Sequence, residues 1–140
     1  MHSLCFRTYL SLAKNQLTGS IPPELVNDLP ALTSLRLYEN SLTGSIPPEI
    51  GDLKSLTFLA IGDSDISGTI PEEVCNLSKL QSLRIYETKV SGSIPDKISD
   101  LKDLEFLSLA GNTLTGSIPN DLFKKVRGLK GLALSGNVSI

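Results

Sequence analysis

A leucine-framed pattern of about 24 residues recurs along this chain of 140 residues and constrains its fold more than any other feature. A repeat of this length cannot bury its apolar face alone, so the copies must stack on one another. The whole of 1–140 is therefore expected to form a single domain of stacked repeats. The repeats start near Arg7, Leu32, Leu56, Leu80, Leu104 and Leu129.

Each copy follows the template LxxLxLxxNxLTGxIP, which predicts its local structure. The LxL core alternates apolar and outward residues with the period of a β-strand. The Asn that follows can satisfy backbone groups in a bend, and Ile-Pro with a nearby acid suits the first turn of a short helix or 3-10 segment. The expected inward rows are Leu10, Leu35, Leu59, Leu83, Leu107, Leu132 and Leu12, Leu37, Ile61, Ile85, Leu109, Leu134.

The "LTGSIP" and "SGTIP" stretches make the chain resemble plant-type leucine-rich repeat proteins over essentially its whole length. The resemblance implies an α/β solenoid: a right-handed superhelix with a concave parallel sheet of about six strands and short 3-10 or helical convex returns. In this family such arrays form ectodomains of receptor-like kinases and receptor-like proteins, and polygalacturonase-inhibiting proteins. It also implies an extracellular or cell-surface location and a role in recognition.

The ends of the chain depart from that family's pattern. The paired-cysteine N-terminal cap and a C-terminal cap are both absent, although terminal repeats need a polar cover. We therefore expect a fragment of a longer array, a truncated product, or a chain that self-associates through its uncapped ends. The first residues lack the apolar stretch of a signal peptide. Cys5 and Cys75 are too far apart in a stacked array to pair, so both are expected to be free thiols.

The outward strand positions are where solenoids bind their partners. Arg, Tyr and Glu occupy them in alternate copies, in "SLRLYEN" at 34–40 and "SLRIYET" at 82–88. Neighbouring strands lie about 4.8 Å apart, so each like pair should be separated by roughly 10 Å. Arg and Tyr dominate binding hot spots, so we expect a peptide, protein or glycan to bind here. The candidate residues are Tyr9, Arg36, Tyr38, Glu39, Phe58, Asp63, Arg84, Tyr86, Glu87 and Phe106.

Other interpretations stay open. Arg36–Glu39 and Arg84–Glu87 could be exposed ion pairs worth under about 1 kcal/mol, and the alternation could reflect duplication of a 48-residue unit. The chain could also be a self-associating scaffold. A third alternative is an ice- or surface-binding ladder of hydroxyls, formed by Thr18, Thr43, Ser67, Ser91, Thr115 and Ser20, Ser45, Thr69, Ser93, Ser117.

Two sequons offer candidate glycosylation sites if the chain is secreted: Asn76-Leu77-Ser78 and Asn137-Val138-Ser139. The first is expected on the convex return, away from the binding face. Cys75, beside it, is expected to be a small convex-side filler rather than a reactive thiol.

Composition and motifs exclude several classes of function. The net charge of −2 is spread along the chain, which argues against nucleic acid as a partner. His2 is the single histidine, so no Ser–His–Asp set and no credible metal site can form. Phosphate-binding loops are absent. We therefore expect no enzyme activity, no cofactor and no metal. No run of roughly 20 apolar residues is present, so no membrane span is expected.

Overall fold

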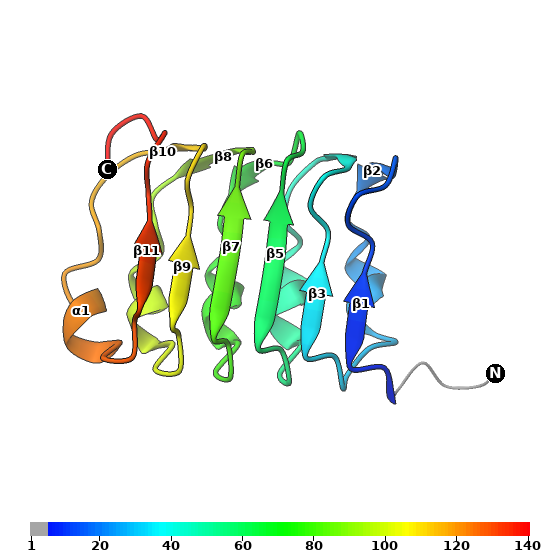
Figure 1. Cartoon of the computed structure of the whole chain (residues 1–140), viewed down its shortest axis with the longest axis horizontal. Coiled ribbons are helices and arrows are strands. Elements are labelled where there is room, and N and C mark those ends of the chain that lie inside the picture. Colours follow the sequence, from blue (N-terminus) through cyan, green and yellow to red (C-terminus); the bar gives the residue numbers. More distant parts are fainter. Residues whose placement is uncertain (1–5) are drawn as a thin grey trace.

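The computed structural model of this protein describes residues 6–140, which form a solenoid of stacked coils (Figure 1). The free thiol expected at Cys5, and His2, lie outside these residues. Each coil contributes one strand to a parallel sheet, in the order β1-β3-β5-β7-β9-β11. The strands of this six-stranded sheet are β1 (Tyr9–Ser11), β3 (Ser34–Arg36), β5 (Phe58–Gly62), β7 (Ser82–Tyr86), β9 (Phe106–Ser108) and β11 (Gly131–Ala133).

The leucine rows form the core between this sheet and the returning segments. The register pairs Leu35 with Leu59 and Leu59 with Leu83, so equivalent leucines of successive copies lie side by side. All three are fully buried, and Ile46 of an Ile-Pro motif joins the same apolar cluster. Stacking therefore buries in each coil an apolar face that a single coil would expose to water. The predicted inward rows and the predicted six-stranded parallel sheet are confirmed.

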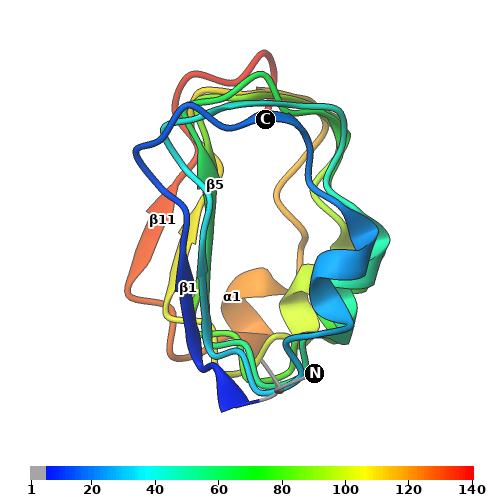
Figure 2. The same ribbon diagram turned by 90° about the vertical axis from the view of Figure 1, so that its right-hand side faces the viewer.

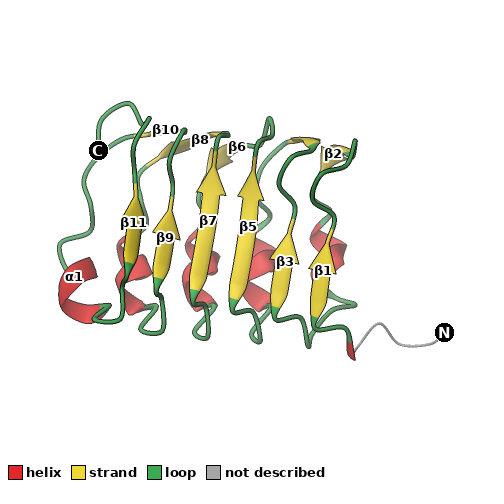
Figure 3. Cartoon of the chain, in the orientation of Figure 1, coloured by secondary structure: helices red, strands yellow, loops and turns green. Residues whose placement is uncertain are grey.

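Short helical segments return the chain on the side opposite the sheet (Figures 2 and 3). Proline occupies the N-cap of each of the four 3-10 helices between Pro23 and Asp100, with ψ between 130° and 139°, which stops the preceding segment before the helical turn begins. The predicted helical returns are confirmed. They are η2 (Pro23–Val26), η3 (Pro48–Asp52), η4 (Glu72–Asn76), η5 (Asp96–Asp100) and α1 (Leu122–Lys125).

A further row of short strands, not expected from the sequence, runs along one edge of the coils (Figure 1). It forms two small parallel sheets, β2-β4 and β6-β8-β10, joined by a bridge between Ser45 and Ser67. The glycine of each "TGS"-type stretch explains the template, because its φ is left-handed (76° at Gly44) and a Cβ there would lie 3.1 Å from Ser20 of the preceding coil. The strands are β2 (Thr18–Ser20), β4 (Ser41–Thr43), β6 (Ser67–Thr69), β8 (Lys89–Gly92) and β10 (Thr113–Leu114).

The template asparagines fix the bend between the two rows of strands. The Nδ2 group of Asn40 donates to the backbone oxygens of Leu37 in its own coil (3.1 Å) and Leu12 in the preceding coil (2.9 Å). Its Oδ1 accepts from the backbone nitrogen of Leu17 at 3.1 Å. Asn137 bonds in the same way. These contacts satisfy backbone groups that the stacked coils remove from water.

The two copies without asparagine differ from each other. The Thr88 hydroxyl donates to Oδ1 of Asn112 and accepts from the backbone nitrogen of Val90 at 3.4 Å, so it relays the contact that asparagine makes elsewhere. The Ser64 hydroxyl is buried and has no hydrogen-bond partner among residues 6–140. The bend after β5 is therefore the least well satisfied of these positions.

Candidate ligand-binding face

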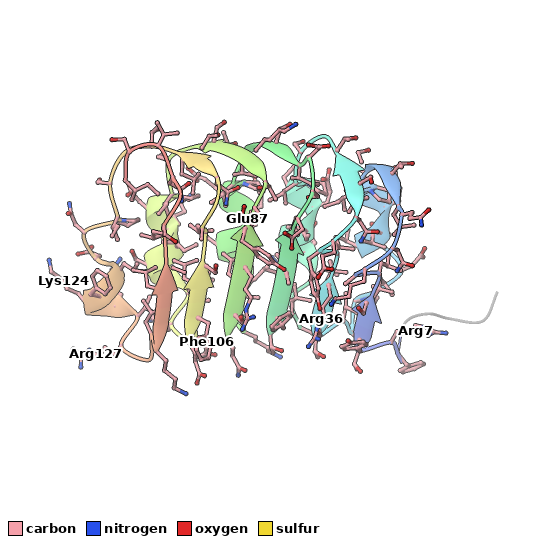
Figure 4. The ribbon with its side chains drawn as sticks, turned by 45° about the horizontal axis from the view of Figure 1, so that its top comes forward. Arg7, Arg36, Glu87, Phe106, Lys124 and Arg127 are labelled. Carbon is pink, nitrogen blue, oxygen red and sulfur yellow. The ribbon has the colours of Figure 1, made fainter. Side chains whose placement is uncertain are left out.

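The outward side of the six-stranded sheet, which we call the sheet face, carries large and small side chains in alternation. Figure 4 shows Arg36, Phe106 and Glu87 on it, with Glu87 toward the C-terminal ends of the strands. The first outward position of successive strands holds Tyr9, Ser34, Phe58, Ser82, Phe106 and Gly131. The second holds Ser11, Arg36, Ala60, Arg84, Ser108 and Ala133.

Arginine and aromatic side chains alternate across five neighbouring strands in an arginine–aromatic ladder of Tyr9, Arg36, Phe58, Arg84 and Phe106. The guanidinium carbon of Arg36 lies 5.3 Å from the ring centre of Tyr9 and 4.7 Å from that of Phe58. Arg84 approaches Phe58 from the opposite neighbouring strand, at 5.3 Å. Such cation–π contacts contribute about 0.5–1 kcal/mol each when exposed and more when desolvated. The ladder therefore holds both arginines close to the sheet.

Neither arginine forms the ion pair with its own glutamate that one interpretation of the sequence required. Within the part of the chain that the structure describes, the ion-pair partner of Glu39 is Lys14, at 3.5 Å, and Glu87 has none. The backbone explains this, because φ is 54° at Glu39 and 48° at Glu87. At these left-handed bends the backbone leaves the direction of the strand, so the two carboxylates do not continue the row of strand side chains. The interpretation as exposed Arg–Glu pairs is therefore wrong.

The same bends correct the expected position of the acidic row. Glu39, Asp63 and Glu87, which we call the acid rim, were expected on the strands but follow the last strand residue in left-handed turns. For residues other than glycine, this left-handed backbone conformation costs roughly 1–2 kcal/mol per residue. The last two copies have Gly111 and Gly136 at this position and avoid that cost. The Glu87 carboxylate leans over Gly111, into space that a Cβ would fill.

The two tyrosines lie closer together than the strand spacing predicts. The ring centres of Tyr38 and Tyr86 are 6.5 Å apart and the rings are tilted by 41°, rather than parallel and roughly 10 Å apart. Gly62 of the intervening strand β5 permits this approach, since a Cβ on it would lie 2.6 Å from the Tyr86 ring. The missing side chain of one coil therefore lets the large side chains of its neighbours converge.

Tyr86 also has an altered acidity. Burial is the main cause that raises the pKa of the Tyr86 phenol to about 12, and the negative charge of Asp63 adds to it. The phenol is thus neutral over the whole physiological range and can donate a hydrogen bond to a partner. The acid rim imposes a negative potential at this end of the sheet face, whereas the arginines lie on the strands, each three residues before the glutamate of its own copy.

Two shallow hollows adjoin each other on the sheet face and share Arg84 and Tyr86. One has a volume of about 390 Å³ and is lined by Arg36, Tyr38, Phe58, Ala60, Arg84 and Tyr86. The second, of about 440 Å³, is lined by Arg84, Tyr86, Phe106, Leu107, Ser108, Gly131, Leu132 and Ala133. Together they bring six of the ten expected site residues to one trough. Tyr9 and the three residues of the acid rim do not line it.

Small residues are the part of the site that sequence reasoning missed. Ala60 and Gly62 are buried beneath the larger neighbours, and a Cβ on Gly131 would lie 2.8 Å from the Phe106 ring. The signal was present in the rows that contain the aromatic residues and the arginines, where each of these large side chains is flanked by Ser, Ala or Gly in at least one adjacent copy. The alternation of large and small outward residues between neighbouring copies therefore reflects how side chains pack on the sheet face.

The hydroxyl ladder is staggered rather than aligned. Thr69 pairs with Ser91 and Ser91 with Thr113, so equivalent template positions are offset by two residues between neighbouring strands. The Ser67 hydroxyl donates to the backbone oxygen of Gly44, at 3.3 Å, and Ser91 donates in the same way to Gly68. Part of the hydrogen-bonding capacity that the ladder hydroxyls were expected to offer to water is therefore used within the protein.

The two sequons differ in what their asparagines do. Asn76 is exposed at the end of η4, on the side opposite the sheet. Asn137 is half-buried, and its Nδ2 group donates to the backbone oxygens of Leu109 and Leu134, both at 2.8 Å. The nearby Cys75 is half-buried, and burial, with Glu72 next in importance, raises its thiol pKa to about 11. The thiol is therefore protonated and weakly reactive near neutral pH.

Residues 6–140 contain neither a metal-binding cluster nor a helix suited to a membrane. No group of three or more His, Cys, Asp or Glu side chains in that range is placed to hold a metal ion. None of the helices in the same range has the length and apolar character needed to cross a membrane.

Stacked coils, buried leucine rows and bonded asparagines define a leucine-rich repeat solenoid. The model of the leucine-rich repeat region family matches residues 3–135. No curated protein sequence matched significantly. The chain belongs to the leucine-rich repeat family, and the solved structures it resembles include plant receptor ectodomains, which makes it a repeat array of the plant type.

Three solved structures illustrate the similarity. The plant peptide hormone receptor RGFR1, in complex with RGF2, is 32% identical with a TM-score of 0.87; the match covers 92% of this chain and 20% of that one. A plant ice-binding protein is 36% identical with a TM-score of 0.87, over 94% of this chain and 43% of that one. The BIR3–SERK2 complex from Arabidopsis thaliana gives 38% identity and a TM-score of 0.82, over 94% and 68%. This chain thus spans about a fifth of the receptor's length.

Proposed function

We propose that this chain is a non-enzymatic recognition module that binds a peptide or protein through its sheet face. The observation that carries the proposal is the arginine–aromatic ladder, which presents two arginines that have no carboxylate partner among residues 6–140, beside two adjoining hollows. Arg and aromatic residues are the types that dominate interface hot spots. Structures similar to this chain are complexes with a peptide hormone or a partner receptor, which supports the same use here.

The test is selection of binders from a random peptide library against the purified protein. Peptides so obtained should lose affinity for the variant Arg36→Ala/Tyr86→Ala by roughly a hundredfold, since two hot-spot side chains are removed. The matched control is Glu72→Ala/Lys97→Ala, which removes an ion pair of 2.8 Å on the helical side and should leave affinity unchanged. Equal affinity for both variants, or a library that yields no binder, would refute the proposal.

We also propose an extracellular location, based on the receptor ectodomains among the similar structures. Expression through a plant secretory pathway should then attach a glycan at Asn76, which is exposed. Asn137 should remain unmodified, because its amide nitrogen is bonded within the bend. Mass spectrometry of Asn76→Gln and Asn137→Gln separates the two, and a mass shift lost only in the second variant would contradict the assignment.

A second candidate function, ice binding by the hydroxyl ladder, is favoured by the similarity to a plant ice-binding protein. The stagger and the internal bonds of Ser67 and Ser91 count against it. A thermal-hysteresis measurement decides between the two. Activity that disappears in Thr43→Val/Thr69→Val, and persists in Arg36→Ala/Tyr86→Ala, would favour ice binding over peptide recognition.

A further inference from the structure

The two Ser-Leu-Arg triplets of the sheet face bond differently although their sequences are the same. In the second triplet, the Nε of Arg84 donates to Oγ of Ser82 at 3.2 Å. In the first, the Nε of Arg36 and the Oγ of Ser34 are both buried, and neither has a hydrogen-bond partner among residues 6–140. The Ser-Leu-Arg triplet can therefore form this bond within one strand, but the bond is absent between Arg36 and Ser34.

The neighbouring rings account for the difference. The Arg36 guanidinium lies near two rings, those of Tyr9 and Phe58, whereas Arg84 has a cation–π contact with Phe58. Arg36 is half-buried and Arg84 is exposed. No carboxylate in the described part of the chain pairs with Arg36, and Glu39 pairs with Lys14 instead. Arg36 is thus a partly desolvated cation with an unsatisfied donor and no counter-charge.

We infer that Arg36 is the anchor for a carboxylate of the bound peptide, with Arg84 as a weaker second contact; the inference rests on the recognition function proposed above. A charge-assisted hydrogen bond is stronger where the local dielectric is low, and part of the desolvation of Arg36 has already taken place. Arg84 would exchange an existing hydrogen bond for the new one, so it gains less.

The occupant we assign is an acidic side chain of an extended peptide. Both arginine guanidinium groups lie near the Phe58 ring, so this central ring is not free for a sugar to stack on. The two guanidinium carbons lie no more than about 10 Å apart, since each is close to the same ring. A peptide in the extended polyproline II conformation has three residues per turn and advances about 3.1 Å per residue, so carboxylates three residues apart lie on one side and reach both arginines.

The experiment titrates the protein with the acetylated, amidated peptide (Gly-Gly-Asp)4 and follows the arginine Nε–Hε signals by NMR, assigned with Arg36→Lys and Arg84→Lys. Lysine keeps the charge and removes the Nε donor. The Arg36 signal should move further than the Arg84 signal. Arg36→Lys should weaken binding by roughly tenfold and Arg84→Lys by less than roughly threefold, as expected for a satisfied and an unsatisfied charged donor.

The control probes are (Gly-Gly-Asn)4, which has the same length without charge, and an oligogalacturonide with four carboxylates. Equal losses in the two lysine variants, equal binding of the asparagine peptide, or tighter binding of the oligogalacturonide would overturn the inference. Library peptides that still require Arg36 and Tyr86 but contain no acidic residue would overturn it while leaving the recognition function intact. Loss of that requirement would remove both proposals.

Discussion

Segments 34–40 and 82–88 are nearly identical in sequence, and their differences in structure come from the coils beside them. Arg36 lies near the rings of Tyr9 and Phe58 and keeps an unsatisfied Nε, whereas Arg84 bonds Ser82. Glu39 pairs with a lysine of the preceding coil, which has no counterpart for Glu87. In a solenoid, then, the environment of a side chain is set by the repeats on either side as much as by its own repeat.

The largest effect should appear at the template asparagine position, where one segment has Asn40 and the other has Thr88. Asn40 makes four hydrogen bonds, and Asn40→Ala should lower the free energy of unfolding by about 3 kcal/mol because buried backbone groups lose their partners. Thr88→Ala should cost about 1 kcal/mol, since Thr88 relays a single contact. Urea unfolding followed by circular dichroism measures both.

The control for this pair is Asn15→Ala, because the side-chain amide of Asn15 donates only to exposed backbone oxygens of its own coil. It should be nearly neutral. Equal losses at positions 40 and 88 would show that the asparagine ladder adds no stability beyond that of the threonine relay.

Gly62 separates the two segments, and a methyl group there should disturb both. Gly62→Ala places a Cβ 2.6 Å from the Tyr86 ring and should cost about 2 kcal/mol through overpacking. Gly128→Ala is the matched control, because a Cβ there meets nothing within 4 Å. In a Tyr86→Ala background the penalty at position 62 should vanish. A penalty that persists would mean that the backbone, rather than the tyrosine, requires glycine.

The coil between the segments can be improved. Ser64→Asn should raise the free energy of unfolding by about 1 kcal/mol, because asparagine can make the bonds that the buried hydroxyl does not. Ser64→Ala serves as the comparison and should change stability little. A loss of stability in the asparagine variant would show that the bend after β5 cannot accommodate the ladder geometry.

The smallest effect concerns the titration of Tyr86. Its folded pKa of about 12 lies above the ordinary value of 10, so the neutral phenol stabilises the fold. That contribution is complete below pH 10 and is lost as the pH rises from 10 to about 12. Absorbance at 295 nm should show a late-titrating phenol that disappears in Tyr86→Phe and titrates earlier in Asp63→Asn. An unchanged curve in Asp63→Asn would leave burial as the whole cause.

The sequence was sufficient for the fold because the leucine period and the Ile-Pro motif each specify a local structure that stacking then repeats. The buried rows through Leu35 and Leu59, the strand order and the helical returns all follow from that period. The arrangement of the candidate site could not be predicted as well. The convergence of Tyr38 and Tyr86 depends on a glycine in another coil, and the turn at Glu39 depends on a φ value that charged residues seldom adopt.

The alternation of large and small residues makes two coils, rather than one, the unit by which this array can change length. Deleting the 24 residues of the coil that carries β5 would place Arg36 and Arg84 on adjacent strands, about 4.8 Å apart, with the two tyrosines beside each other. Deleting or inserting 48 residues would keep every arginine next to an aromatic ring. Recombination between repeats, in evolution or in design, should therefore preserve this surface in even steps and disrupt it in odd ones.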